Sequence, residues 1–332
     1  MKPHAESGTA GRDGSAPRDK PLFIVNPRSG GGRTGEVFES LRGPIERIVG
    51  EIDVAFTEGP RHASDIAEEA AMAGRGTVVA VGGDGSIHEV TCGLMIARER
   101  GKNATTLGVL GQGTGGDFRR TLGLEHRLDR YCRAIAGGVA REVDVGRFSY
   151  QAFDGSEKTA YFINILSAGM GGLVDRYVAQ MHRSMGGTLA YFGASLRGLL
   201  ESEIGHLTCT VRHRGAERVE TLSTRNIAIC NGRYFGSGMH VAPMADPFDG
   251  QLEVVSLGDA PKVKFALASS RIYSGKHLLS PDVVHFPCDR ITIELENKGV
   301  ADRFLLDVDG EALGKLPITI DVVPRALRVL VP

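Results

Sequence analysis

The chain has 332 residues, of which 39 are Lys or Arg and 40 are Asp or Glu, so its formal net charge is −1. A charge this close to zero gives no overall field that would attract nucleic acid, and we expect no nucleic-acid partner. The length suits two domains better than one core. The five cysteines lie far apart and form no CxxC pair, which favours reduced thiols in a cytosol.

Residues 1–20 are rich in Gly, Ser, Pro and charge, and they lack the apolar core of a signal peptide. We interpret them as a disordered tail. Beyond them, strand-like and helical patterns alternate. The patterns predict strands at 22–26, 51–57, 77–81 and 105–110, and helices at 34–49, 62–73 and 87–98. Because such alternation is typical of βαβ units, we expect an α/β domain with a parallel sheet over residues 21–140.

Strands dominate the remainder of the chain, where a helical pair near 171–202 interrupts them. The strands are predicted at 141–150, 159–168, 206–214, 217–230, 251–257, 290–296, 303–308, 317–323 and 326–331. We interpret residues 141–332 as a mainly antiparallel, β-sandwich-like domain with helices. A cleft between the two domains is then the expected functional site.

A glycine turn with one acid follows the strand at 77–81. Residues 82–89 read Gly-Gly-Asp-Gly-Ser-Ile-His-Glu, and glycine lets the backbone approach a ligand closely, so that N–H groups can point at phosphate oxygens. Asp84 is the anionic group among those donors. A carboxylate beside a polyphosphate is repelled unless a divalent cation lies between them or the carboxylate accepts a proton. The alternative is a tight turn in which Asp84 caps the next helix.

Two more glycine turns follow strands in the same half of the chain, at 26–32 and 111–118. Because strand-to-helix turns of a parallel sheet lie at its carboxyl edge, where open α/β sheets bind ligands, we expect the three turns to converge. The glycines at 111, 113 and 116 also have the Gly-x-Gly-x-x-Gly spacing of the dinucleotide-binding fingerprint. That fingerprint opens the first βαβ unit of a domain, however, whereas this one comes late in the chain.

These turns resemble the nucleotide loops of the diacylglycerol kinase catalytic-domain family, which includes bacterial lipid kinases, sphingosine kinases and ceramide kinases. The likeness covers about residues 20–331 in the expected order. It is carried by Asn26-Pro-Arg-Ser-Gly30, Gly82-Gly-Asp-Gly-Ser86, Gly113-Thr-Gly-Gly-Asp-Phe118, Phe162-Ile-Asn-Ile-Leu-Ser-Ala-Gly169, Asn231-Gly-Arg-Tyr-Phe-Gly236, Ala242-Pro-Met-Ala245, Asp249-Gly-Gln-Leu-Glu253 and Asp309-Gly-Glu311. In this family the C-terminal strands return to the first domain, so the resemblance implies that a boundary near residue 140 is approximate.

The resemblance implies a kinase that uses ATP and Mg²⁺ and holds the nucleotide with loop residues. Those residues are Asn26, Pro27, Arg28, Ser29, Gly30, Thr57, Gly83, Asp84, Gly85, Ser86, Ile87, His88, Glu89 and Thr114. Since the sequence contains no Walker-type phosphate loop, loop N–H groups, Arg28 or Arg33 and metal would have to hold the phosphates. Asp117 is implied to support the metal or the substrate, and a helix cap before Phe118 is the plainer explanation of this acid.

By the same resemblance Glu311 accepts the proton of the substrate hydroxyl, with Asp84 and Asp309 as the other catalytic acids. Whether Asp84 or Glu311 is the base stays open, and a plain Asp-Gly hairpin also explains residues 309–311. A carboxylate near two others and bound phosphate has its pKa raised, which suits a base. Three positions match those that hold a second, structural Mg²⁺ in bacterial members: Asp246, Asp249 and Gln251. An ordinary turn explains that segment as well.

Two positions depart from the family pattern. Gly116 stands where Asn is usual, and Ser86 replaces the commoner Thr but keeps the hydroxyl. The missing Asn removes an amide that could bond a headgroup. This difference bears on the identity of the substrate more than on nucleotide binding.

The resemblance implies transfer of the ATP γ-phosphate to a lipid hydroxyl, with diacylglycerol as the first choice and phosphatidic acid as the product. Sphingoid bases, ceramide, monoacylglycerol and glycolipids stay open as substrates. Two other classes stay open too. One is a kinase for soluble substrates, of the NAD kinase or phosphofructokinase type, and the other is an inactive lipid-binding module.

The chain has no uninterrupted apolar stretch near the ~20 residues that a membrane-spanning helix needs. A cytoplasmic protein that contacts a lipid substrate peripherally at the inner face of the membrane is therefore expected. An apolar helix at 187–200 resembles the family's stretch near the lipid pocket, although a core helix explains it too. A loose basic cluster could face anionic lipid or simply solvent: Lys262, Lys264, Arg271, Lys276 and His277. Whether the chain forms a homodimer stays open.

Overall fold

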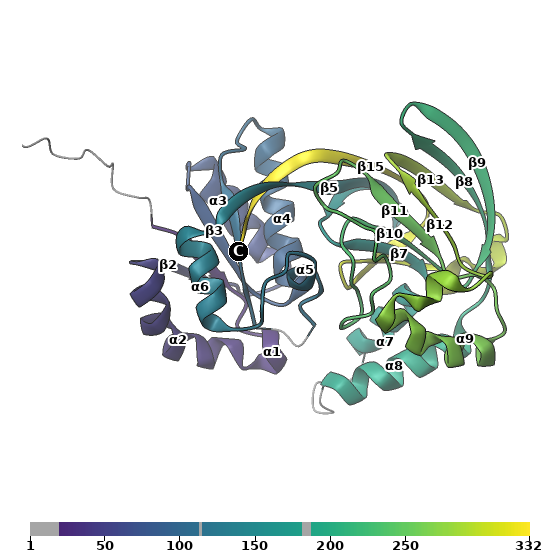
Figure 1. Ribbon diagram of the computed structural model, residues 1–332, viewed down its shortest axis with the longest axis horizontal. Coiled ribbons are helices and arrows are strands. Elements are labelled where there is room, and N and C mark those ends of the chain that lie inside the picture. The colour runs from purple at the N-terminus through teal and green to yellow at the C-terminus, as the bar shows by residue number, and fades with distance from the viewer. Residues whose placement is uncertain (1–19, 113–114, 181–186) are drawn as a thin grey trace, which may run out of the picture.

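The computed structural model describes residues 20–112, 115–180 and 187–332. The predicted tail, apart from Lys20, and the predicted nucleotide contact Thr114 lie outside the described residues. Two bodies lie side by side, the first with helices around a parallel sheet and the second rich in antiparallel strands (Figure 1). The predicted fold class, an α/β domain followed by a β-sandwich-like domain, is confirmed.

The centre of the first body is a set of parallel strands. They are β1 (Leu22–Val25), β2 (Asp53–Phe56), β3 (Thr77–Gly82) and β4 (Thr106–Gly111), in the spatial order β4-β3-β1-β2. β3 and β4 are buried along almost their whole length. Parallel strands with both faces covered are expected to be continuously apolar, and these two are.

Helices alternate with these strands. They are α1 (Ser29–Gly32), α2 (Thr34–Val49), α3 (His62–Met72), α4 (Asp84–Glu99), α5 (Asp117–Thr121) and α6 (Leu128–Gly137). On α2 the apolar side chains of Phe38 and Ile45 are two turns apart and join the core that surrounds the sheet. Since α1, α4 and α5 begin close to the ends of β1, β3 and β4, their first turns gather at one edge of the sheet.

The second body consists mostly of antiparallel strands. They are β6 (Glu157–Phe162), β7 (Ile165–Gly169), β8 (Gly205–His213), β9 (Ala216–Thr224), β10 (Asn226–Cys230), β11 (Leu252–Ser256), β12 (Val284–Cys288), β13 (Arg290–Leu295) and β14 (Leu305–Val308). Their inward residues form a separate core around Phe148, Phe162 and Phe304. Two apolar cores of this kind explain why the chain folds as two bodies.

Helices cover the lower side of the second body in Figure 1. They are α7 (Met170–Gln180), α8 (Gly187–Glu201), α9 (Lys262–Ala268) and the 3₁₀ helices η2 (Ser269–Ser274), η3 (Lys276–Leu279) and η4 (Lys298–Arg303). The helical pair predicted near 171–202 corresponds to α7 and α8.

Two long strands connect the bodies. β5 (Val139–Ala152) and β15 (Glu311–Val331) pair antiparallel from one end of β5 to the other, and Figure 1 shows them arching together across the molecule. The end of β15 lies parallel to β4, with Arg328 opposite Thr106. β15 also pairs with β13 and β14, so the described strands form one continuous sheet.

The helix predicted to begin at residue 87 begins at Asp84. The N–H groups of Ser86 and Ile87 both donate to the Gly83 carbonyl (3.1 and 3.3 Å), so the helix starts inside the glycine turn. The acid that is the candidate for chemistry is therefore the first residue of a helix.

The strands predicted at 317–323 and 326–331 are one strand, β15. Pro324 cannot donate a ladder hydrogen bond, and the pairing with β5 shifts register there. The next residue, Arg325, has a φ of +50°, and its N–H donates to the Asp144 carboxylate (2.7 Å). A bulge stabilised by a distant side chain thus carries the strand past the proline.

Other differences have equally local causes. The strand predicted at 217–230 is two strands, because at Arg225 the chain leaves the hairpin with β8, and its guanidinium is buried against carbonyls of Ser202 and Ala260. The strand predicted at 159–168 is likewise two, β6 and β7. The predictions do not include α6 or the edge strand β12, whose Pro287 is unusual within a strand.

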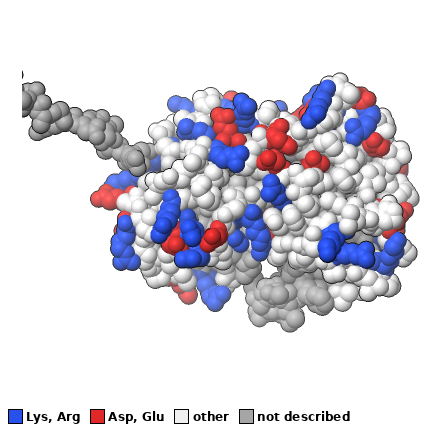
Figure 2. Space-filling model, viewed as in Figure 1, with Lys and Arg blue, Asp and Glu red and all other residues white. Residues whose placement is uncertain are grey.

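Acidic and basic side chains alternate over the viewed face of the molecule (Figure 2), in keeping with the net charge of −1. Within the part of the chain that the structure describes, no helix has both the length and the apolar character needed to cross a bilayer.

Candidate functional site

The turns after β1, β3 and β4 touch one another at the carboxyl edge of the parallel sheet. Asn26 Nδ2 donates to Ser86 Oγ (3.4 Å), and the Gln112 N–H donates to the Gly82 carbonyl (2.8 Å). A Cβ atom at Gly30 would lie 2.8 Å from the Gln112 carbonyl oxygen. The three glycine turns that the sequence predicts to converge are therefore in direct contact.

Glycine is needed at position 82 because the turn folds back onto the first turn of α4. A Cβ atom at Gly82 would lie 2.2 Å from Ser86 Oγ, far inside van der Waals contact. In the turn after β1, Gly30 and Gly31 have φ values of +59° and +73°, which residues with side chains rarely adopt. Both turns thus depend on glycine to keep backbone N–H groups close to the surface.

Asp84 is bonded to the start of α5. Its Oδ2 accepts the Asp117 N–H (3.0 Å) and its Oδ1 accepts the Phe118 N–H (3.1 Å). A carboxylate here satisfies donors that a helix N-terminus leaves free, and the helix dipole favours its charge. Because Asp84 is also the first residue of α4, one side chain fixes the starts of two helices. Each oxygen keeps acceptor capacity for one further partner.

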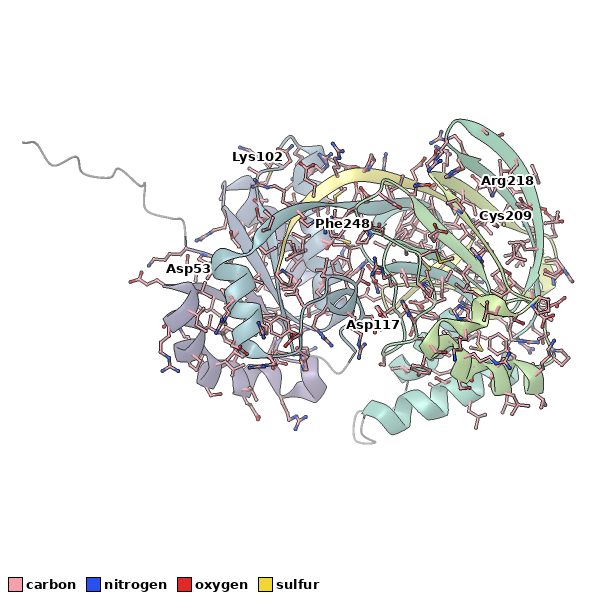
Figure 3. The ribbon with its side chains drawn as sticks, in the orientation of Figure 1. Asp53, Lys102, Asp117, Cys209, Arg218 and Phe248 are labelled. Carbon is pink, nitrogen blue, oxygen red and sulfur yellow. The ribbon has the colours of Figure 1, made fainter. Side chains whose placement is uncertain are left out.

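Asp117 is buried where the first body faces the second (Figure 3). Its Oδ1 accepts from Arg120 (2.6 Å), and its Oδ2 accepts the N–H of Ser237, which belongs to the second body (2.8 Å). Burial and the neighbouring Asp84 raise the pKa of Asp117 to about 6. The two carboxylates therefore form a pair whose mutual repulsion a bound cation would relieve.

The predicted nucleotide residues fall into two groups. Those at least partly exposed lie in the first turn and in the centre of the second: Asn26, Pro27, Arg28, Ser29, Gly30, Gly83 and Gly85. Gly30, Gly83 and Gly85 present backbone N–H groups to a ligand, and Arg28 presents its guanidinium. The N–H groups of Asn26, Arg28 and Ser29 donate within the protein, and proline has none. Thr57 is buried at the end of β2, and its N–H donates to the Val25 carbonyl (2.9 Å).

In the second group the side chains are engaged inside the protein. Ser86 bonds Asn26, and Ile87 belongs to the core. Glu89 accepts the N–H groups of Arg61 (3.0 Å) and Ala63 (3.2 Å), so it caps α3 as Asp84 caps α5. These side chains hold the turn and the start of α3 in place.

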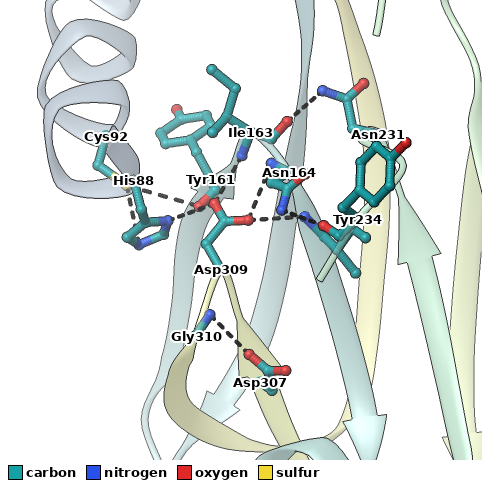
Figure 4. Close-up of polar contacts among 11 residues, drawn as sticks. His88, Cys92, Tyr161, Ile163, Asn164, Asn231, Tyr234, Asp307, Asp309 and Gly310 are labelled. Carbon is teal, nitrogen blue, oxygen red and sulfur yellow. Dashed lines mark hydrogen bonds and ion pairs between the residues drawn. The ribbon is translucent and has the colours of Figure 1, made fainter. Parts of the chain in front are cut away.

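Asp309, in the turn between β14 and β15, holds the two bodies together (Figure 4). Its carboxylate accepts the N–H groups of Ile163, Asn164 and Ile165 at 2.9–3.1 Å, and His88 Nδ1 on α4 lies 2.9 Å from its Oδ2. A carboxylate has about four acceptor sites, and all are used here. This geometry indicates that Asp309 positions the turn.

His88 is the partner of Asp309 in the first body. Burial lowers the pKa of its imidazole, but the adjacent Cys92 and the Asp309 carboxylate outweigh burial and raise the pKa well above its usual range. His88 and the Asp309 carboxylate thus make a buried polar contact between α4 and the turn. The two residues are 221 positions apart in the chain, so the pair fixes one body against the other.

Glu311, two residues after Asp309, faces the central glycine turn. Its Oε1 lies 3.9 Å from the position that a Cβ atom would take at Gly85. Burial raises the pKa of Glu311, the charge of His88 opposes this shift, and the charges of Glu89 and Asp309 add to it. Among the described residues, none donates a hydrogen bond to this carboxylate. A carboxylate in this position with a raised pKa is of the kind that suits a general base.

The motif analysis missed a buried acid pair, Asp175 of α7 and Asp307 of β14. Burial and the charge of Asp307 raise the pKa of Asp175 well above its usual range, and the two carboxyl groups are hydrogen-bonded to each other. Asp307 also accepts the Gly310 N–H (3.0 Å) and the Ser167 hydroxyl (3.2 Å). The pair ties α7 to the turn that carries Glu311. The sequence did contain one sign of this pair, because Asp307 is an acid within the otherwise apolar strand β14.

The segment predicted to hold a structural Mg²⁺ is a turn tied to β5. Asp249 Oδ1 accepts the Gln251 N–H (2.9 Å), and Asp144 Oδ2 accepts the Gly250 N–H (2.7 Å). Burial raises the pKa of Asp249, and the charge of Asp246 adds to the shift. Closely spaced carboxylates are ligands of the kind that Mg²⁺ prefers.

The carboxylates are arranged in pairs and do not form complete cages. Within the described ranges, no group of three or more His, Cys, Asp or Glu side chains is placed to hold one metal ion. The donor chemistry of Asp84 with Asp117, and of Asp246 with Asp249, fits Mg²⁺. In either place the remaining ligands would have to come from water, backbone carbonyls or bound phosphate.

Two family models match the chain, one for each body. The diacylglycerol kinase catalytic domain matches residues 20–148, and the YegS C-terminal NAD kinase beta sandwich-like domain matches residues 164–331. The second match alone covers more than half of the chain. The resemblance that the motifs carry is therefore confirmed over both bodies.

Similar proteins align over nearly their full length. A diacylglycerol kinase from Bacillus subtilis is 26% identical over 93% of this chain and 95% of its own. A protein from Citrobacter koseri named probable lipid kinase YegS-like is 28% identical over 94% of this chain and 95% of its own length. The crystal structure of a diacylglycerol kinase from Bacillus anthracis superposes with a TM-score of 0.67 at 20% identity, over 96% of this chain and 98% of that one.

Proposed function

This chain belongs to the diacylglycerol kinase catalytic-domain family, and from that premise we propose that it transfers the γ-phosphate of ATP to a lipid hydroxyl. Diacylglycerol is the first candidate for the acceptor and phosphatidic acid for the product. Its relatives are named as a diacylglycerol kinase and a probable lipid kinase, and phosphotransfer to a lipid is common to both names. The choice of diacylglycerol rests on the similarity to a protein named diacylglycerol kinase.

The observation that carries the proposal is the position of Glu311. Two buried contacts, His88 with Asp309 and Asp175 with Asp307, hold its turn in place, and the carboxylate faces Gly85 without a protein donor. A base from one body thus faces a phosphate-type loop of the other. This is the arrangement that transfer between two substrates needs.

In the proposed step the lipid hydroxyl oxygen attacks the γ-phosphorus. The new oxygen–phosphorus bond forms as the bond from that phosphorus to the β,γ-bridging oxygen breaks and ADP leaves. The hydroxyl proton passes to Glu311, whose raised pKa makes it a stronger base than an ordinary carboxylate. Arg28 and the N–H groups of Gly83 and Gly85 would hold the phosphates of ATP.

Mg²⁺ is part of the proposal, with Asp84 and Asp117 as the residues that would hold it beside the nucleotide. When bound, it would neutralise charge on the transferred phosphoryl group. The raised pKa of Asp117 supports this placement, because two close carboxylates are most stable with a cation between them. Asp246 and Asp249 are the proposed structural site.

The proposed place of action is the inner face of the membrane. An acyl-chain lipid stays in the bilayer because each buried CH₂ contributes ~0.8 kcal/mol, and ATP is a cytoplasmic substrate. The protein would therefore have to meet its lipid from the water side, as a peripheral protein.

The test is to incubate the purified chain with γ-labelled ATP, Mg²⁺ and a panel of micellar lipids, beside NAD and fructose 6-phosphate. We expect label in phosphatidic acid when diacylglycerol is present. The same incubation with Glu311→Gln is the control for a contaminating kinase. Label in a soluble product alone would contradict the proposal, and label in ceramide or a sphingoid base alone would correct the acceptor.

A further inference from the structure

The segment 262–279, which comprises α9, η2 and η3, exposes an unusual number of large apolar side chains. Val263, Leu267 and Leu279 are 74%, 76% and 84% exposed, the highest values for large apolar residues in the described part of the chain, and Tyr273 is exposed as well. Val263 and Leu267 are four residues apart and share one face of α9. Single exposed apolar residues are ordinary, but a cluster of them marks an interaction surface.

The same segment is apolar on its inner side. Phe265 and Ile272 are buried in a small core with Val255 and Leu257 of the sheet. A hollow of about 250 Å³ lies between α9, η2 and the loop at Asp282. The helix is thus anchored by one apolar face while the other remains in contact with water, so burial within the chain does not explain Val263 and Leu267.

The charge of this surface is positive, unlike that of the whole chain. From residue 259 to 282 there are four basic residues (Lys262, Lys264, Arg271, Lys276) and two acidic ones (Asp259, Asp282), whereas the full sequence has a net charge of −1. Lys264 pairs with Asp282 (2.6 Å). Arg271 and Lys276 are exposed, and Figure 2 shows basic side chains over the lower right of the second body, where α9 lies in Figure 1.

We propose that the exposed face of residues 262–279, with the adjoining end of α8, is the surface by which this protein docks onto an anionic lipid bilayer. Apolar side chains flanked by Lys and Arg suit the boundary between headgroups and acyl chains. Leu196 and Leu200 of α8 extend the surface. Both are exposed, and Lys262 Nζ donates to the Leu200 carbonyl (2.6 Å), which holds α8 and α9 together.

A short series of contacts connects this surface to the candidate site. The His240 N–H donates to the Ile272 carbonyl (3.1 Å), and its ring stacks on Tyr234 with centroids 4.4 Å apart. The Tyr234 carbonyl accepts from Asn164 Nδ2 (2.9 Å), and the Asn164 N–H bonds Asp309 (3.1 Å). The docking surface and the Glu311 turn therefore belong to one rigid part of the second body. Docking would present that part to the membrane.

The inference rests on the proposed function only in the choice of a lipid bilayer as the partner. Binding to vesicles requires no catalysis, so it can be measured on Glu311→Gln. If that variant binds vesicles while the native chain phosphorylates no lipid, the docking surface stands and the proposed function fails. If the native chain phosphorylates short-chain lipid but does not bind vesicles, the proposed function stands and the docking surface fails.

The apolar part is tested with the double variant Leu267→Ser/Leu279→Ser. We expect its partition onto vesicles of phosphatidylglycerol and phosphatidylcholine, measured by sedimentation, to fall by about 10-fold or more. The control is Val219→Ser, which removes an exposed apolar side chain from a different surface, 63% exposed on β9. The control should bind like the native chain. Equal binding by the double variant would overturn the proposal.

The charged part is tested with Arg271→Glu/Lys276→Glu. We expect vesicle binding to fall by about 10-fold or more when the bilayer is anionic and to change little on phosphatidylcholine alone. Activity on a short-chain, monomeric lipid should be kept. Lys102→Glu, at an exposed site on the first body, is the control for a charge reversal outside the proposed surface. Native binding that is indifferent to phosphatidylglycerol would overturn the electrostatic part of the proposal.

A second copy of the chain is the other candidate occupant of an exposed apolar face. Sedimentation velocity of the native chain and of Leu267→Ser/Leu279→Ser decides between the two. If the native chain and the double variant are both monomers, the membrane proposal is supported. A native dimer that the double variant dissociates, without a change in vesicle binding, would assign the surface to self-association and overturn the proposal.

Discussion

The acids of the two facing turns are used differently. In the first body Asp84 is bonded to the start of α5, whereas in the second body Asp309 uses all its acceptor sites on protein donors and Glu311 uses none. An acid in a turn motif therefore has one of two tasks, holding the turn or meeting the substrate. In the second body Asp309 holds the turn, and Glu311 is left for the proposed proton transfer. In the first body Asp84 holds the start of α5, and the proposed metal contact would fall to the same side chain.

Glu311→Gln should have the largest effect. The amide keeps the shape but cannot accept a proton, so we expect kcat to fall by about 1,000-fold, within the range of general-base catalysis, while ATP binding stays the same. Turnover with the lipid substrate and equilibrium binding of ATP are the measurements. Loss of ATP binding would instead place Glu311 in the nucleotide or metal site. The distinction between Asp309, which holds the turn, and Glu311, which is left for the substrate, would then be wrong.

The pH dependence of the native enzyme is a second test of Glu311 as the base. Burial raises the pKa of Glu311 above the 4.5 of an ordinary Glu. Since the base must be ionised, kcat/KM should decline as the pH falls through this raised pKa, at a higher pH than an unperturbed Glu would give. A rate that stays constant down to pH 4.5 would exclude Glu311 as the base.

Asp84→Asn should have the next largest effect. We expect kcat to fall by about 100-fold because a charge that positions metal or phosphate is lost. One of the two bonds to α5 also loses its acceptor, which should lower the free energy of unfolding by about 1 kcal/mol. Urea denaturation separates the two effects. A stability loss with near-normal turnover would show that Asp84 acts only as a cap.

Gly82→Ala and Gly85→Ala test the glycine turn itself. A Cβ atom at Gly82 would clash with Ser86 Oγ at 2.2 Å, so we expect a loss of about 2 kcal/mol in unfolding free energy. At Gly85 the Cβ atom would make an ordinary contact with Glu311 at 3.9 Å, and stability should change by less than about 0.5 kcal/mol. Equal losses in the two variants would contradict the described geometry of the turn.

Gly116→Asn should have the smallest effect on turnover and only a small effect on stability. Gly116 has φ +63° and ψ +47°, the left-handed region that Asn tolerates better than other side chains. The Cβ atom would lie 2.7 Å from Arg119 Nε, a flexible group that can move. We expect a change of less than about 1 kcal/mol, with any functional effect in the ratio of kcat/KM between diacylglycerol and ceramide. A large stability loss would show that Asn does not fit here.

The sequence predicts the first body well because its signals are local. A run such as Val78–Val81 followed by glycines marks a buried strand and its turn without any distant information. The convergence of the turns then follows from the rule for parallel sheets. The start of α4 at Asp84 was missed because glycines at 83 and 85 suggest a loop, although the helix begins among them.

The second body was predicted less well because its decisive contacts are distant in sequence. No local pattern shows that Asp309 bonds His88, or that Asp144 accepts the Arg325 N–H across 181 positions. The candidate base itself came from a family motif. Its supporting residues, His88 and Asp175, required the fold, because burial and pairing determine their charge states.

The paired strands β5 and β15 determine how the two halves can move. A single extended linker swivels freely about its backbone dihedrals, but a hydrogen-bonded ribbon cannot rotate without breaking its ladder. The ribbon therefore restrains rotation of one half against the other, and the buried contact between His88 and Asp309 restrains it as well. The ladder of the ribbon is irregular at two places. At the bulge beyond Pro324, where ladder bonds are missing, the Asp144 carboxylate accepts the Arg325 N–H instead.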